Sequence, residues 1–128
     1  HAVLQAKAHI RGRFIVMNGD DLFAREDIEK LIPHPFAALA MEVADPSKFG
    51  AIQVDSSGNL INIVEKPKEH ISNLANIGCY TFEPEIFSIL EQTPLGERGE
   101  IEITSAILTI AKHRPFIGVF SIINLKVK

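Results

Sequence analysis

The stretch Phe-Ile-Val-Met-Asn-Gly-Asp-Asp, residues 14–21, decides the fold of this chain. Its first four residues form a continuous apolar run rich in strand formers, and the run stops abruptly at Asn18. We therefore predict a buried strand over residues 14–17 that delivers polar residues at its carboxyl end. Because ligands of open α/β sheets collect at the carboxyl ends of strands, Asp20 is the first candidate for a functional residue.

Two interpretations of Asp20 are open from the motif alone. A hard cation such as Mg²⁺ takes one or two protein carboxylates and fills its other positions with phosphate oxygens and water, so one aspartate could suffice. Alternatively, Asp20 or Asp21 caps the following helix or shapes a turn. The rest of the chain has to decide between them.

Outward from this strand, the pattern predicts alternating helices and strands with one hairpin. Residues 55–59, Asp-Ser-Ser-Gly-Asn, are typical of a hairpin turn between two extended runs. Gly78 inside a strand indicates a bulge or a close backbone approach, and Thr104 can cap a helix. We expect an α/β fold with a mixed, mainly parallel sheet, flanking helices and a β-hairpin. The expected strands are 14–17, 36–43, 49–54, 60–64, 74–82 and 116–123, and the expected helices are 1–10, one ending at Pro33, 84–93 and 104–111.

Composition restricts both the size and the partners of the chain. Its 128 residues, 46% of them hydrophobic, suit one folding unit with one core. The 16 acidic and 13 basic residues are scattered, so we expect no nucleic-acid partner. No apolar run approaches about 20 residues and no leader opens the chain, so we expect no membrane span and a cytoplasmic location. Cys79 is expected to be a small buried side chain, and the five histidines lack the spacing of a zinc site.

Six blocks of sequence carry a more specific pattern. In chain order they are HAVLQAK (1–7), FIVMNGDDLF (14–23), FGAI (49–52), IVEKP (63–67), SNLANIG (72–78) and GEIEIT (99–104). Together they resemble the middle of the sugar-1-phosphate nucleotidyltransferases, which include glucose-1-phosphate thymidylyl- and uridylyltransferases and N-acetylglucosamine-1-phosphate uridylyltransferases. The resemblance implies a Rossmann-like nucleotidyltransferase domain that transfers a nucleotidyl group from a nucleoside triphosphate to a sugar 1-phosphate.

The resemblance also implies a role for five residues. Asp20 matches an aspartate that binds Mg²⁺, and Lys66 matches a lysine that meets the sugar phosphate as a compact charge. Gly50 matches a glycine whose backbone contacts the sugar, while Glu65 and Asn76 match residues that hydrogen-bond to sugar hydroxyls. Each has a plainer interpretation: a solvated charged loop for Glu65 and Lys66, backbone relief for Gly50, and a turn for Asn76.

Two parts of the family pattern are missing from the sequence. The glycine-rich nucleotide-binding segment belongs before His1, and residues 119–128 contain no acidic residue where a second metal aspartate is expected. We therefore interpret residues 1–128 as one partial domain, and we expect no appreciable nucleotidyl transfer by this chain alone. A non-catalytic sugar-phosphate-binding remnant, an interaction module and a metal-dependent glycosyltransferase are the alternatives, and a homo-oligomer is left open.

Overall fold

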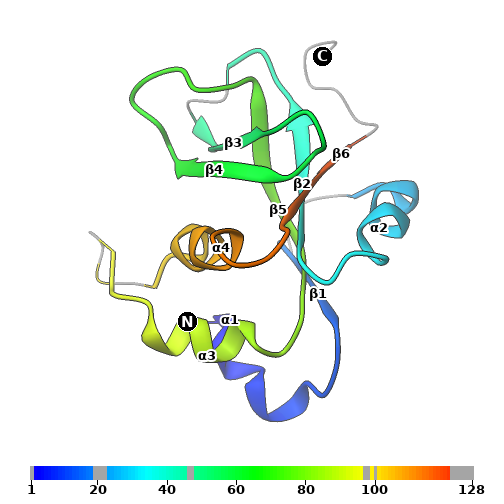
Figure 1. Cartoon of the computed structure of the whole chain (residues 1–128), viewed down its shortest axis with the longest axis vertical. Coiled ribbons are helices and arrows are strands. Elements are labelled where there is room, and N and C mark those ends of the chain that lie inside the picture. Colours follow the sequence, from blue (N-terminus) through cyan, green and yellow to red (C-terminus); the bar gives the residue numbers. More distant parts are fainter. Residues whose placement is uncertain (1, 19–22, 46–47, 97–98, 100, 122–128) are drawn as a thin grey trace.

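The computed structural model describes residues 2–18, 23–45, 48–96, 99 and 101–121. A six-stranded sheet forms the middle layer, with α2 on one face and α1, α3 and α4 toward the other (Figure 1). The strands are β1 (Phe14–Met17), β2 (Ala37–Glu42), β3 (Gly50–Val54), β4 (Leu60–Glu65), β5 (Leu74–Phe82) and β6 (Ile117–Phe120). The helices are α1 (Ala2–Gln5), the 3₁₀ turn η1 (Lys7–His9), α2 (Arg25–Leu31), α3 (Ile86–Gln92) and α4 (Ile103–Ala111).

Strand β5 is the centre of the sheet. Its first half pairs with β3, its second half pairs with β1, and β2 pairs with it along the other edge. The expected mixed α/β fold is confirmed, but the expectation of a mainly parallel sheet is wrong for the strands described. Only β2 and β6 are parallel, because β5 inserts in the opposite direction between β1 and β2, and β3 and β4 form an antiparallel hairpin.

The apolar pattern of the strands explains why both faces of the sheet are covered. The larger core joins Phe36, Phe82 and Phe116 of the sheet to buried side chains of α3 and α4. The smaller core packs Leu31 of α2 against the opposite face, where Cys79 is fully buried as expected. Burial on both faces is the reason that β2 is a continuous apolar run instead of an alternating one.

Two predicted helices differ in their ends. The expected helix over residues 1–10 is divided into α1 and η1, since helices this short are marginal in water. The last helix begins at Ile103 with Glu102 at the N-cap position, so Thr104 lies inside it and is buried instead of capping it. The final strand ends at Phe120, and residues 122–123 of the expected strand lie outside the described part.

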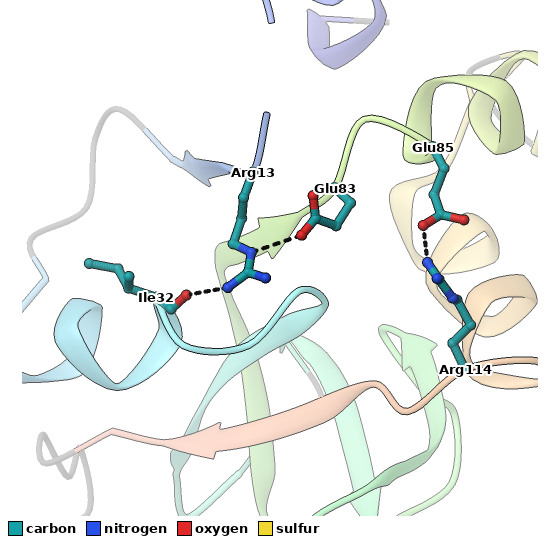
Figure 2. A network of polar contacts seen from close by, with 5 residues as sticks. All are labelled: Arg13, Ile32, Glu83, Glu85 and Arg114. Atoms are coloured by element: carbon teal, nitrogen blue, oxygen red, sulfur yellow. Dashed lines mark hydrogen bonds and ion pairs between the residues drawn. The ribbon is translucent and has the colours of Figure 1, made fainter. Parts of the chain in front are cut away.

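Ion pairs join the loops at the edge of the sheet where β2 and β6 begin. Figure 2 shows Arg13 donating to Glu83 and to the carbonyl of Ile32, while Arg114 pairs with Glu85. These pairs are partly exposed to solvent, so each contributes little to stability. Among the described helices, none has the length and apolar character needed to cross a membrane.

Candidate functional site

Three predicted site residues lie side by side across three strands. Gly50 of β3 pairs with Glu65 of β4 on one side and with Asn76 of β5 on the other. Directly paired residues present their side chains to the same face of a sheet, so the carboxylate and the amide flank the glycine. A Cβ atom at residue 50 would lie 3.2 Å from Glu65 Oε2 and 3.3 Å from Asn76 Cβ. The gap between the two polar side chains therefore exists because residue 50 has none.

A cavity of about 500 Å³ lies over this row of residues. Its walls come from the carboxyl end of β1, from β5, and from the first residues of α1 and α4. The lining combines polar side chains on the sheet with apolar side chains from the helix ends. In chain order it consists of Ala2, Val3, Val16, Met17, Asn18, Lys48, Phe49, Gly50, Glu65, Asn76, Gly78, Tyr80 and Ile103.

Asn76 and Tyr80 form a polar pair in the wall of the cavity. The Asn76 Nδ2 donates to the Tyr80 hydroxyl at 2.7 Å, and the Asn76 Oδ1 accepts from the amide of Gly78 at 3.2 Å. Burial raises the pKa of Tyr80 to about 12, partly offset by the hydrogen bond from Asn76 and helped by the charge of Glu65. The phenol is therefore protonated at neutral pH, and since it accepts from Asn76, its own proton can be donated elsewhere.

Gly78 connects this pair to the end of β1. Its φ is +79°, a conformation that favours glycine, and its carbonyl accepts from the amide of Asn18 at 3.0 Å. A Cβ at residue 78 would lie 2.1 Å from Asn18 Nδ2. The bulge or close approach predicted at Gly78 is thus confirmed in both respects, because β5 also shifts register against β2 at this point.

The other two predicted site residues are not in the described cavity wall. Lys66 directly follows β4 and is exposed, with a left-handed φ of 43° that ends the strand, and it is not among the lining residues. The described lysine in the lining is Lys48. Asp20 lies outside the described residues.

The arrangement suits a small polyhydroxylated ligand that carries negative charge. Glu65 is an acceptor, the Tyr80 hydroxyl can donate, Asn76 can do both, and Lys48 supplies a positive charge. No group of three or more potential metal-ligating side chains occurs within the described ranges.

Sequence reasoning missed Asn18, Lys48 and Tyr80. A single tyrosine within an apolar strand gives no sign in the sequence of its hydrogen-bond partner, so Tyr80 could not be singled out. Asn18 was available as the first polar residue after the predicted strand over residues 14–17. Lys48 directly precedes the Phe-Gly pair, but its place in the cavity that Asn76 also lines depends on the pairing of Gly50 with Asn76.

Comparisons with known proteins agree on one family. The family model described as Nucleotidyl transferase matches residues 1–119. The chain is 39% identical over 118 residues to the bifunctional protein GlmU of Methanocaldococcus jannaschii and 44% identical over 121 residues to that of Methanococcus aeolicus. These matches cover 92% and 93% of this chain but only 29% of each relative.

Solved structures show the same similarity in three dimensions. A UDP-glucose pyrophosphorylase complexed with UDP-glucose aligns with a TM-score of 0.77 at 31% identity, covering 94% of this chain and 53% of that one. A UTP-bound UGPase from Acinetobacter baumannii aligns with a TM-score of 0.75 at 25% identity, covering 95% and 48%. This chain therefore spans about half the length of those structures.

Proposed function

Because this chain belongs to the nucleotidyl transferase family, we propose that it forms the sugar-1-phosphate-binding part of an enzyme that makes nucleoside diphosphate sugars. In that reaction a phosphate oxygen of the sugar 1-phosphate forms a bond to the α-phosphorus of a nucleoside triphosphate, and pyrophosphate leaves. The observation that carries the proposal is the gap at Gly50 between Glu65 and Asn76, which is open toward a cavity of about 500 Å³. One similar protein is complexed with UDP-glucose and another is bound to UTP, which supports the same substrate class.

Each residue has a distinct proposed role. Glu65 accepts hydrogen bonds from sugar hydroxyls. Asn76 and Tyr80 provide further hydrogen-bonding groups for these hydroxyls, and we call the three residues together the hydroxyl-binding wall. Gly50 lets the side chains of Glu65 and Asn76 lie close together at the cavity, because a side chain at residue 50 would push them apart. Lys66, which directly follows Glu65 of the cavity wall, contacts the phosphate, and Lys48 in the lining supplies a second positive charge. Such a site binds and orients its substrate, and positioning with electrostatics provides most of the rate in phosphoryl-type transfer.

Magnesium is the cofactor that this site would use. A hard cation of this kind takes one or two protein carboxylates and fills its other positions with phosphate oxygens and water. We propose Asp20 as the protein ligand, on the basis of its place directly after β1 and of its match to the family motif. The ion would offset charge on the phosphates.

Binding of glucose 1-phosphate to the ¹⁵N-labelled chain tests the proposal. We expect the amide signals of Gly50, Lys66 and Asn76 to shift together, with a dissociation constant of about a millimolar or weaker. One charge-assisted hydrogen bond contributes only about 1.5 to 3 kcal/mol, and a millimolar constant corresponds to about −4 kcal/mol. Replacing Lys66 by Ala should remove most of the response, because it removes the phosphate partner.

The matched control is Lys68→Ala, an exposed lysine two residues further along the same segment. Its response to glucose 1-phosphate should equal that of the parent, and uncharged glucose should shift Gly50 and Asn76 without shifting Lys66. Shifts scattered over the surface, or an unchanged response in Lys66→Ala, would show that the family ancestry persists without this binding function.

A further inference from the structure

We propose that Asn18 is a positioning residue for sugar recognition. Packed against Gly78, it holds the bulge of β5 that directs the amide of Asn76 and the hydroxyl of Tyr80 into the cavity. This inference rests on the proposed function and extends it to a residue that acts through the backbone of a neighbouring strand.

The bulge brings Asn76 and Tyr80 within hydrogen-bonding distance. Ala38 of β2 pairs with Tyr80 and Ala40 pairs with Asn76, so three residues of β5 oppose the single residue Leu39. In a regular strand the Cα atoms of residues i and i+4 lie about 13 Å apart, whereas partners two residues apart are separated by about half as much. The extra residues in the bulge therefore shorten the distance between Asn76 and Tyr80 along the sheet. This lets Asn76 Nδ2 donate to the Tyr80 hydroxyl at 2.7 Å. Bulges commonly redirect side chains in this way.

Gly78 is the residue through which Asn18 acts. Its amide donates to Asn76 Oδ1, and its carbonyl accepts from the amide of Asn18. Both backbone polar groups of one left-handed glycine thus join β1 to the polar pair in the cavity wall. The place where a side chain of residue 78 would be is taken by the Asn18 side chain, whose Nδ2, Cγ and Oδ1 lie 2.1, 2.6 and 3.1 Å from that Cβ position.

The geometry predicts what happens when the Asn18 side chain is shortened. Asn18→Ala leaves space directly over Gly78, so the bulge can relax and the Gly78 amide no longer fixes Asn76. Asn76 and Tyr80 of the hydroxyl-binding wall are then no longer held in place, whereas Lys48 and Lys66, which bind the phosphate, are unaffected. Affinity for a sugar phosphate should fall and affinity for inorganic phosphate should not.

The sequence offers a direct probe of this change, because Tyr80 is the single tyrosine and the chain has no tryptophan. The tyrosine band of the near-UV circular dichroism spectrum and the tyrosine emission therefore report on Tyr80. We expect Asn18→Ala to lose most of the Tyr80 dichroism and to bind glucose 1-phosphate about tenfold more weakly, with binding of inorganic phosphate unchanged. Asn18→Asp keeps the size of the side chain and should restore the dichroism.

The matched control is Asn62→Ala on β4, which removes a hydrogen bond to Gln53 outside the cavity. The proposal is overturned if Asn18→Ala keeps the dichroism and the affinity of the parent, or if Asn62→Ala loses them equally. Asn18→Ser provides the same comparison if Asn18→Ala does not fold. If the parent itself does not bind glucose 1-phosphate, the proposed function fails, and the ligand-free dichroism of the variants still decides the positioning role.

Discussion

At the scale of single residues, Gly50 matters because it lacks a side chain and not because of its backbone freedom. An added methyl group would meet Glu65 Oε2 at 3.2 Å and Asn76 Cβ at 3.3 Å, both tighter than ordinary contacts. We expect Gly50→Ala to weaken glucose 1-phosphate binding about tenfold or more, at a cost of about 1 to 3 kcal/mol in the free energy of unfolding. Titration by NMR and urea denaturation measure the two effects separately.

Gly12→Ala is the matched control for this substitution. A Cβ at Gly12 meets nothing within 4 Å, and its φ is not left-handed. We expect binding and stability to stay close to those of the parent. A Gly50→Ala chain that binds with parental affinity would mean that the close spacing of Glu65 and Asn76 is not needed for sugar binding.

At the scale of elements, the turn between β3 and β4 depends on one carboxylate. Asp55 accepts from the amides of Ser57 and Asn59, each at 2.9 Å, and the bond from the Asn59 amide is the main reason that the pKa of Asp55 is lowered. A lowered folded-state pKa stabilises the fold above the ordinary value of 3.8, and this contribution is lost as the pH falls through the lower folded value. We expect Asp55→Ala to lower the melting temperature at pH 7, with a difference from the parent that shrinks below about pH 4.

Ser56→Ala, in the same turn, provides the control. Its melting temperature relative to the parent should not change with pH, because it removes no titratable group. A difference between Asp55→Ala and the parent that is constant from neutral to strongly acidic pH would contradict the role of the ionised carboxylate.

At the scale of the whole molecule, Cys79 reports global unfolding. It is fully buried in β5, and burial first, then the charge of Asp27, raises the pKa of its thiol to about 11 from 9.0. At pH 8 the thiolate fraction is therefore about a hundredfold smaller than for an ordinary thiol. We expect a thiol reagent such as dithionitrobenzoate to react with the native chain at least about a hundredfold more slowly than with the chain unfolded in urea.

Phe82→Leu shows whether the rate follows global stability. Phe82 is fully buried and packs against the rings of Phe14, Tyr80 and Phe116, so the substitution should lower the free energy of unfolding by about 1.5 kcal/mol. The thiol reaction should then be about tenfold faster if it proceeds through global opening. Phe120→Leu, at a side chain that is 53% exposed, should leave the rate unchanged. A fast reaction in the parent would show that Cys79 is accessible without unfolding.

The sequence alone determined the strands, the hairpin and three of the residues in the site. Apolar runs of strand formers predict strands without reference to the rest of the chain, and the Asp-Ser-Ser-Gly-Asn turn fixes the hairpin locally. The hairpin pairs Glu65 with Gly50, so the local turn signal is enough to predict that these two residues are neighbours. The family pattern then added Asn76.

Tertiary structure decided which strands are neighbours and therefore what faces the cavity. The position of β5 between β1 and β2 makes most pairings antiparallel, and no local pattern encodes the order of strands distant in sequence. That order places Asn18 against Gly78 and Lys48 near Asn76, and the register shift of β5 brings Tyr80 to Asn76. The physical reason is that packing and strand pairing act between residues far apart in the chain, whereas propensity and turn chemistry act between close neighbours.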